Sequence, residues 1–164
     1  EVAEYITHEG SSPSLDTDRF MAEWGVDMSV SHPGGVEGVE PELHAPPREV
    51  YLLQRKTSKP GKGLGKTTGW IHRSSLKMRD VQMVPGVEYR KIDDAGLHLT
   101  VNGEEQVLDV DTVIVCTGQE PLRELQAGLE SAGEKVTLIG GADVAAELDA
   151  KRAIDQGSRV AAAL

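Results

Sequence analysis

The stretch VEYRKIDDAGLHLTVNGEEQVLDV, residues 87–110, decides the fold of this chain. It contains three runs of strand-forming residues, at 87–92, 97–101 and 106–110. The segments between these runs, DDAG and NGEE, are typical of tight hairpin turns. We therefore predict a three-stranded antiparallel meander whose second hairpin is closed by Asn102 and Gly103. Every second residue of the middle run is apolar, so we expect one face to carry Leu97, Leu99 and Val101.

The segments on both sides of the meander alternate between helix and strand. Apolar periodicity predicts helices at 1–6, 17–24, 70–78 and 149–164, with Asp16 capping the second. Short apolar runs predict strands at 50–54, 81–84, 112–116 and 136–139. This order predicts an α/β fold, a Rossmann-like dinucleotide-binding sheet with the three-stranded antiparallel meander as a crossover. We expect the sheet to be truncated at its N-terminus, because the first helix begins without a cap or a preceding strand.

The composition narrows the classes of partner. The net charge of −10 argues against nucleic acid, whereas the basic residues gathered in 55–79 suit a small anionic ligand. The single cysteine, Cys116, excludes an internal disulfide and a cysteine-ligated cluster within the chain, and its apolar surroundings predict burial. No apolar run is long enough to span a membrane and no signal peptide opens the chain, so we expect a soluble, cytoplasmic protein.

The loop KPGKGLGKTTGW, residues 59–70, has the residue types that bind phosphate. A P-loop needs a glycine, four residues, and then Gly-Lys-Ser/Thr. Gly61 lies only three residues before Gly65, and the required position holds Pro60, which lacks an N–H donor. The spacing is therefore one residue short for a P-loop hydrolase. Two alternatives stay open: a flexible surface loop, and a loop beside the phosphate of a redox cofactor.

Three stretches together resemble a known family: GLGKTTGWIHR (63–73), DTVIVCTGQEP (111–121) and LIGGADVAAELDAKRAIDQG (138–157). They are similar to the C-terminal part of bacterial 2,4-dienoyl-CoA reductases. These are Old Yellow Enzyme-type flavoproteins with a C-terminal module of the pyridine nucleotide-disulfide oxidoreductase kind. The resemblance is close over residues 49–164 and weaker before them.

This resemblance implies an NADPH-dependent oxidoreductase that acts on CH–CH bonds in fatty acid β-oxidation. The chain would bind NADPH and pass its hydride to FAD, while FMN and a 4Fe–4S cluster would lie on an N-terminal barrel outside it. Residues 1–110 would form an incomplete NAD(P)H-binding domain that lacks its first strand and Gly-rich turn. Residues 111–164 would be the C-terminal segment of the FAD-binding domain. The expected partners are the two dinucleotides and the remainder of the polypeptide, with no nucleic acid and no membrane.

The end of the strand at 50–54 should meet the adenosine ribose of the nicotinamide cofactor. NAD is usually held there by an acidic residue, whereas the 2′-phosphate of NADP needs cations. This sequence places Gln54, Arg55 and Lys56 at that point. Arg55 can bind a phosphate with two parallel hydrogen bonds, and Lys56 adds a compact positive charge. We predict NADP recognition by these two residues, and the simpler alternative is a pair of solvated cations.

The resemblance also assigns residues to the flavin. Trp70 would lie near the flavin or gate access of the nicotinamide, although a core position is an alternative. The remaining candidates lie after two predicted strands and at the start of the last helix: Thr117, Gly118, Gly141, Asp143, Leu148, Asp149 and Ala150. Asp143 would accept from a ribityl hydroxyl, and an ordinary turn is the alternative for Thr117 and Gly118. We expect no catalytic side chain and no metal ligand, because hydride transfer is the chemistry of the cofactors themselves.

Two other functions stay open. The chain could be a nucleotide-binding or assembly module without activity of its own, or belong to a related NADH:flavin oxidoreductase. Because the Gly-rich turn that holds a dinucleotide pyrophosphate would precede Glu1, we expect the isolated chain to be inactive and largely free of flavin.

Overall fold

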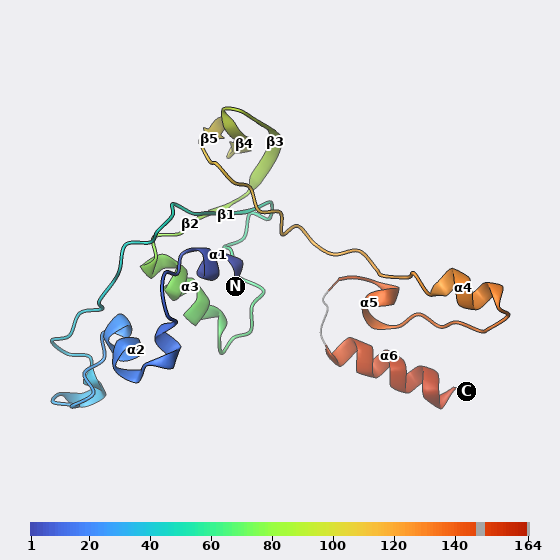
Figure 1. Cartoon of the computed structure of the whole chain (residues 1–164), viewed down its shortest axis with the longest axis horizontal. Helices are drawn as coiled ribbons and strands as arrows, with labels where there is room; N and C mark the ends of the chain where they lie inside the picture. Colours follow the sequence, from blue (N-terminus) through green and yellow to red (C-terminus); the bar gives the residue numbers. More distant parts are fainter. Residues whose placement is uncertain (147–149, 164) are drawn as a thin grey trace. The chain divides into compact units, whose positions relative to one another are not determined.

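The computed structural model describes residues 1–146 and 150–163. The chain divides into two compact units, Glu1–Asp111 and Thr112–Leu164, which are described separately (Figure 1). No helix in the described ranges combines the length and the apolar character needed to cross a membrane.

A β–α–β unit forms the centre of the first unit. Strand β1 (Tyr51–Gln54) is followed by helix α3 (Gly69–Met78) and strand β2 (Gln82–Pro85), and the two strands pair in parallel. The register sets Gln54 opposite Pro85, so both strands end at the same edge. Helix α1 (Val2–Ile6) packs with this unit through a core of Ala3, Val50, Leu76 and Val81. The arrangement is that of a nucleotide-binding half-sheet.

The predicted meander is confirmed. Strands β3 (Val87–Asp93), β4 (Gly96–Val101) and β5 (Glu104–Leu108) pair antiparallel in that order. Asn102 and Gly103 both have positive φ, 53° and 86°, as a two-residue hairpin of the Asn-Gly type requires.

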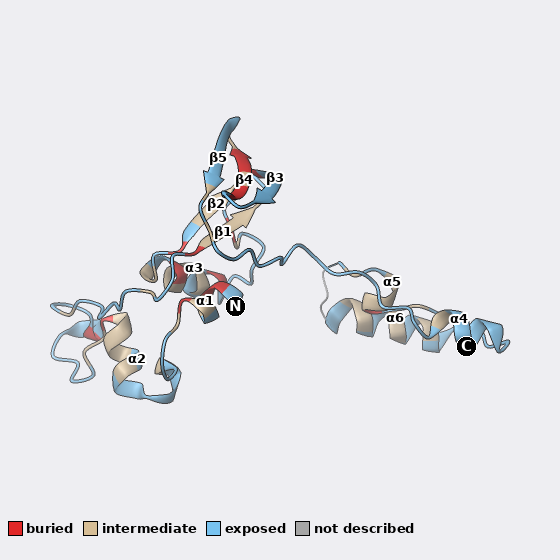
Figure 2. Ribbon diagram, turned by 45° about the horizontal axis from the view of Figure 1, so that its top comes forward, coloured by how far each residue is buried: buried red, intermediate tan, exposed pale blue. Residues whose placement is uncertain are grey.

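The meander has its own apolar cluster, and β4 is its most buried strand (Figure 2). Leu99 is 2% exposed and Val87 is 1% exposed. The cluster is completed by partly buried residues from β4, β5, the segment that follows β5, and the ends of β1 and β2: Val101, Leu108, Val110, Leu53 and Val84. The meander therefore packs against the end of the parallel pair, and the predicted face of Leu97, Leu99 and Val101 contributes to this apolar cluster.

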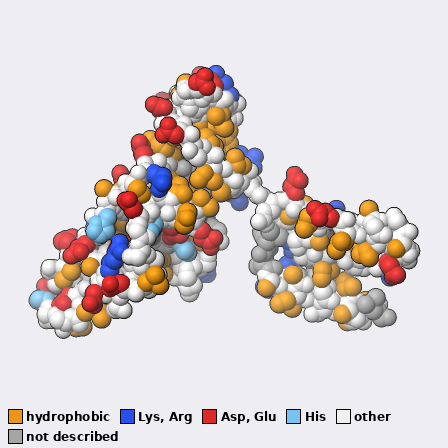
Figure 3. Space-filling view, in the orientation of Figure 1, with side chains coloured by type: hydrophobic (Ala, Val, Ile, Leu, Met, Phe, Trp, Pro, Cys, Tyr) orange, Lys and Arg blue, Asp and Glu red, His pale blue; other side chains and the backbone are white. Residues whose placement is uncertain are grey.

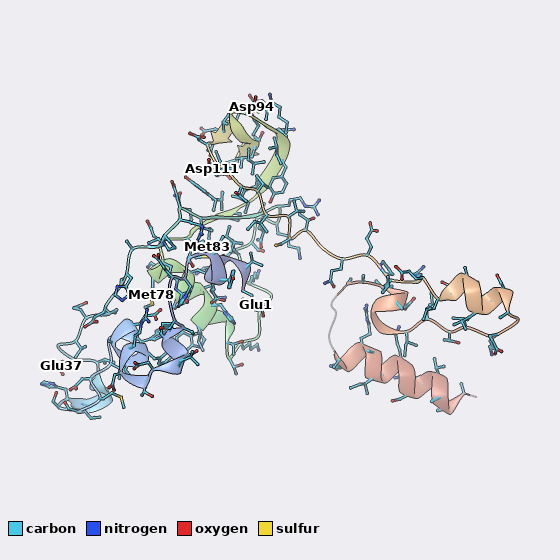
Figure 4. The ribbon with its side chains drawn as sticks, viewed as in Figure 1. Glu1, Glu37, Met78, Met83, Asp94 and Asp111 are labelled. Carbon is cyan, nitrogen blue, oxygen red and sulfur yellow. The ribbon has the colours of Figure 1, made fainter. Side chains whose placement is uncertain are left out.

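Asp93, in the β3–β4 hairpin, is held by several donors. Lys91 Nζ lies 2.5 Å from Oδ2, His98 Nε2 lies 2.7 Å from Oδ1, and the Ala95 amide donates to Oδ1 at 3.0 Å. The hydrogen bond from Lys91, followed by that from His98, holds the pKa of the Asp93 carboxyl well below its usual range. Asp94 beside it makes no hydrogen bond or ion pair with any residue of the described ranges, and it lies at the tip of the hairpin (Figure 4).

We expect Asp93→Asn to lower the stability of the meander at neutral pH, because it removes the carboxylate that these donors share. A carboxyl whose folded pKa is depressed contributes stability above its unfolded pKa, about 4, and loses it as the pH falls. The difference between wild type and variant should therefore shrink as the pH falls below about 4. Hydrogen exchange of the β4 amides across this pH range measures it. Asp94→Asn is the control, and an equal effect of both substitutions would contradict the assignment.

A further helix of the first unit follows the prediction. Helix α2 (Thr17–Trp24) begins after Asp16, whose carboxylate accepts from the Arg19 amide at 3.1 Å. Two short 3₁₀ turns, Pro13–Leu15 and Pro33–Gly35, lie in the loop-rich segments around it.

The second unit departs from the prediction. Its described residues form helices α4 (Gln126–Ser131), α5 (Gly140–Asp143) and α6 (Ala150–Ala162), and α6 matches the predicted closing helix. The strands predicted at 112–116 and 136–139 are absent from the described part of the chain, and Val115 is 73% exposed. Cys116 is exposed, so the expectation of burial is wrong. An extended apolar segment becomes a buried strand only where neighbouring strands take up its N–H and C=O groups.

Candidate dinucleotide-binding site

The predicted phosphate-binding residues follow directly from the end of β1. Arg55 and Lys56 are both exposed. The Lys56 carbonyl accepts from the Gly86 amide at 3.0 Å, which joins this loop to the turn between β2 and β3. Gln54 Nε2 donates to Lys56 O at 3.0 Å and to Ser58 O at 2.6 Å. The backbone that carries the two cations is therefore attached to both neighbouring strands.

The glycine-rich loop that follows folds against α3. Arg73 Nη1 donates to Gly61 O at 3.1 Å, and the amides of Thr68 and Gly69 both donate to Gly65 O. A Cβ at Gly69 would lie 2.8 Å from the Leu64 Cβ, which is closer than real side chains approach. Glycine is thus needed here for close packing of the loop on α3. In the structure this loop is a series of turns that is hydrogen-bonded to α3.

The charges of this region are not neutralised by the protein. Arg55 makes no hydrogen bond or ion pair with any residue of the described ranges. Every other arginine donates to a protein acceptor: Arg19, Arg48, Arg73, Arg79, Arg90, Arg123, Arg152 and Arg159. The lysines of the loop are likewise exposed and unpaired within 1–146 and 150–163: Lys56, Lys59, Lys62 and Lys66. Figure 3 shows acidic side chains spread over the face in view, in keeping with the net charge of −10.

Two residues of α3 have different surroundings. Trp70, in the first turn, is 55% exposed, which excludes the alternative of a core tryptophan. His72 Nδ1 lies 2.9 Å from Glu4 Oε1 and so joins α3 to α1. Burial is the largest single influence and raises the pKa of the Glu4 carboxyl, but the hydrogen bonds and charge interactions with His72 and the Glu1 amino group together outweigh it, so the net pKa is lowered. His72 is therefore engaged in packing the two helices.

In the second unit, the segment Gly140–Asp143 is α5, which packs on α6. The Gly140 amide donates to Gln156 Oε1 at 2.6 Å, and Gln156 Nε2 donates to Asp143 Oδ2 at 3.0 Å. Gly140 has a φ of 56°, and a Cβ there would lie 3.1 Å from the Ala153 Cβ. The structure thus shows that Gly140 is tightly constrained and that one carboxylate oxygen of Asp143 is engaged. The predicted flavin contacts of Gly141 and Asp143 stay predictions.

Two arginines that no sequence motif indicated support the same turn. Arg123 donates to the carbonyls of Ala142 and Asp143, and Arg152 donates to those of Gly140 and Val144. Arg152 and Gln156 are four residues apart on α6, so they share one face of that helix. The four-residue spacing of Arg152 and Gln156 could have indicated from the sequence that both side chains contact the same neighbouring segment.

The other predicted flavin residues are not brought together. Thr117 and Gly118 are exposed in a segment without regular structure, and Gly118 has a φ of 138°. Ala150 is the first residue of α6 and is exposed. Leu148 and Asp149 lie outside the described residues. The roles assigned to these residues therefore stay predictions.

Two hollows of the first unit lie elsewhere. One of about 340 Å³ has His8, His44, Met78 and Arg79 among its lining residues, and one of about 330 Å³ is lined in part by Asp18 and Glu42. Arg55, Lys56 and Trp70 line neither of them. Arg55, Lys56 and Trp70 are all exposed, so the candidate site lies at the surface of the first unit.

Comparison with known proteins agrees with this fold. The chain is 40% identical over 65 residues to a mercuric reductase from Staphylococcus aureus, which covers 37% of the chain and 12% of that protein. It is also similar in structure to a 2-naphthoyl-CoA reductase in complex with 2-naphthoyl-CoA, with a TM-score of 0.56 and 20% identity. That likeness covers 67% of the chain and 16% of the reductase, and it concerns the fold alone. The chain spans less than a fifth of the length of either relative.

A family model matches most of the chain. Residues 26–154 match the pyridine nucleotide-disulphide oxidoreductase family, and the match includes the β–α–β unit, the meander and α5. Members of this family use FAD and a pyridine nucleotide. The chain therefore belongs to the pyridine nucleotide-disulphide oxidoreductase family and has the dinucleotide-binding fold of a flavin-dependent oxidoreductase.

Proposed function

We propose that the Glu1–Asp111 unit binds NADPH and that the Thr112–Leu164 unit belongs to the FAD-binding part of the same enzyme. The observation that carries the proposal is the free guanidinium of Arg55 at the carboxyl end of a parallel strand. In a dinucleotide-binding sheet this edge meets the adenosine ribose. When bound, the cofactors supply the chemistry, the transfer of a hydride from the nicotinamide to the flavin.

The donor set at this edge fits a phosphate better than a ribose hydroxyl. Arg55 and Lys56 supply only donors, and a 2′-phosphate supplies only acceptors at neutral pH. The amide nitrogen of Gln54, at the strand end, already serves the two loop carbonyls. No acidic side chain occupies positions 54–56, where one would accept from the 2′-hydroxyl of NAD. These features support NADP over NAD.

We further propose that the full-length protein reduces a carbon–carbon double bond of an acyl-CoA thioester in the cytoplasm, as dienoyl-CoA reductases do. The three sequence stretches that resemble those enzymes support this substrate class, and the fold is that of a reductase solved with an aryl-CoA. FMN and an iron–sulfur cluster would lie outside residues 1–164. The chain's own residues would bind and orient the two dinucleotides, with Arg55 and Lys56 on NADPH and Asp143 on FAD.

The cofactor proposal is tested by rapid mixing of the full-length protein with NADPH or NADH without oxygen. We expect the flavin to be reduced by both, with an apparent Kd for NADPH about ten- to a hundredfold lower. The competitor 2′,5′-ADP should inhibit strongly, and 5′-AMP, which lacks the 2′-phosphate, is the matched control. Equal inhibition by the two nucleotides, or a preference for NADH, would refute NADPH binding at this site. Turnover of a 2,4-dienoyl-CoA tests the substrate class separately.

A further inference from the structure

The side chain of Gln54 folds back over the loop that follows it. Its amide nitrogen lies 3.0 Å from the Lys56 carbonyl oxygen and 2.6 Å from the Ser58 carbonyl oxygen. Both partners are acceptors, and in a carboxamide only the NH₂ group donates, so the orientation of the amide is determined. The Gln54 side chain thus closes residues 54–58 into a short hydrogen-bonded loop, which we call the bracket. This loop carries the two cations, Arg55 and Lys56.

The same carbonyl has a second donor from another strand. The Gly86 amide, between β2 and β3, donates to Lys56 O at 3.0 Å. Gly86 has a φ of 71°, a left-handed conformation that glycine adopts without strain. The loop is therefore attached to the end of β1 through Gln54 and to the end of β2 through Gly86. Arg55 lies within this attached segment, and its side chain makes no hydrogen bond with either anchor.

We infer that Gln54 is a positioning residue for recognition of the cofactor 2′-phosphate, an inference that rests on the proposed function of Arg55 and Lys56. Gln54 holds the backbone of residues 55–58 in one conformation before the ligand arrives. The two cations are then presented in a fixed arrangement, and binding loses less conformational freedom than it would in an unbracketed loop. The effect reaches the phosphate only through the backbone.

The amide is the group that this geometry requires. A carboxylate at position 54 would face two carbonyl oxygens and would repel them, so it would open the bracket. A carboxylate at the end of this strand is also the feature that selects NAD. Compared with a glutamate at this position, Gln54 places no negative charge at the edge of the sheet. Its amide also holds the loop that carries the positive charges.

Gln54→Met in the full-length protein tests the inference, because methionine keeps the length of the side chain and removes the donor. The probes are 2′,5′-ADP and 5′-AMP, measured by titration calorimetry. We expect the affinity for 2′,5′-ADP to fall about tenfold, with that for 5′-AMP nearly unchanged. Gln82→Met is the matched control, because Gln82 lies at the opposite end of the same strand pair and its amide donates to Glu49. The control should change neither affinity.

Two further measurements separate positioning from a general structural role. In an Arg55→Ala background, Gln54→Met should cause little additional loss for 2′,5′-ADP, because both residues act on the same contact. The Gly86 amide should exchange its hydrogen faster in Gln54→Met than in Gln82→Met. Two results would overturn the inference and leave the proposed function standing. One is that Gln54→Met weakens the binding of 2′,5′-ADP and 5′-AMP equally. The other is that Gln54→Met leaves both affinities unchanged while Arg55→Ala still weakens only 2′,5′-ADP. If Arg55→Ala does not discriminate between the nucleotides, the proposed function itself falls, and the inference with it.

Discussion

Replacing Arg55 with alanine in the full-length protein should weaken the binding of NADPH by about ten- to a hundredfold and leave the binding of NADH nearly unchanged. Loss of one charge-assisted hydrogen-bonding partner typically costs about 1.5–3 kcal/mol, which corresponds to that range. Only NADPH carries the phosphate that Arg55 would bind. The Arg55 side chain is exposed and makes no hydrogen bond or ion pair with the described residues, so we expect its removal to leave the fold intact. Values of kcat/KM with each cofactor measure the effect.

Two controls show whether the effect is specific. Lys66→Ala removes a positive charge from the glycine-rich loop and should have a smaller effect, because a lysine acts as a point charge without fixed geometry. Arg48→Ala is the same substitution shortly before β1, and Arg48 donates to the carbonyl of Ile6 at the end of α1. It should lower stability without changing the preference between cofactors. Equal losses with NADH and NADPH in Arg55→Ala would make Arg55 a structural residue.

Replacing Gly96 with alanine should destabilise the meander by at least about 3 kcal/mol, or prevent it from forming. A Cβ at this position would lie 2.0 Å from the Leu108 carbonyl oxygen and 2.9 Å from its carbonyl carbon, and both are backbone atoms. The φ of 118° is also one that residues with a side chain rarely adopt. Relief of the clash requires β4 and β5 to separate where Leu97 pairs with Leu108. Hydrogen exchange of the β4 amides measures the local loss of stability within a multidomain protein.

Gly103→Ala is the control for this prediction. Gly103 also has a positive φ, 86°, and it closes the next hairpin of the same sheet, but a Cβ there meets nothing within 4 Å. We expect a cost of about 1–2 kcal/mol from the backbone conformation alone. The difference between the two variants therefore isolates the steric contribution at Gly96. Similar losses for both glycines would show that the β4–β5 backbone contact does not limit the substitution.

The local sequence was sufficient where short-range chemistry determines the structure. The meander follows from alternating apolar residues and from an Asn-Gly turn whose two residues adopt positive φ. Helix α2 begins where Asp16 can cap it. The parallel pair of β1 and β2 follows from two apolar runs separated by a helix, a spacing that requires a crossover. The three quoted stretches also pointed to the pyridine nucleotide-disulphide oxidoreductase family, which is confirmed, whereas the dienoyl-CoA reductase class stays a proposal.

The sequence did not reveal which side chains brace these elements. The bracket made by Gln54, the support of α5 by Arg123, and the engagement of His72 by Glu4 join residues that no periodic pattern relates. The sequence also did not show whether Arg55 would have a protein partner, because an arginine that follows a strand can equally donate to a neighbouring carbonyl. Every other arginine in the described chain does bind a protein acceptor.

The sequence by itself thus determined the local elements of this protein: the hairpins, the capped helix, the two parallel strands and the position of two cations at a strand end. Their formation depends on backbone conformation and on contacts between residues close in the chain. Only the tertiary structure decided which groups are satisfied by protein partners and which remain free to bind a ligand. The run at 112–116 illustrates the limit, because its apolar residues predicted a buried strand, yet Ile114 is half exposed. Burial of such a segment requires a neighbouring surface with partners for its backbone groups. An apolar sequence pattern indicates that such a surface is needed, but it does not show whether one is present.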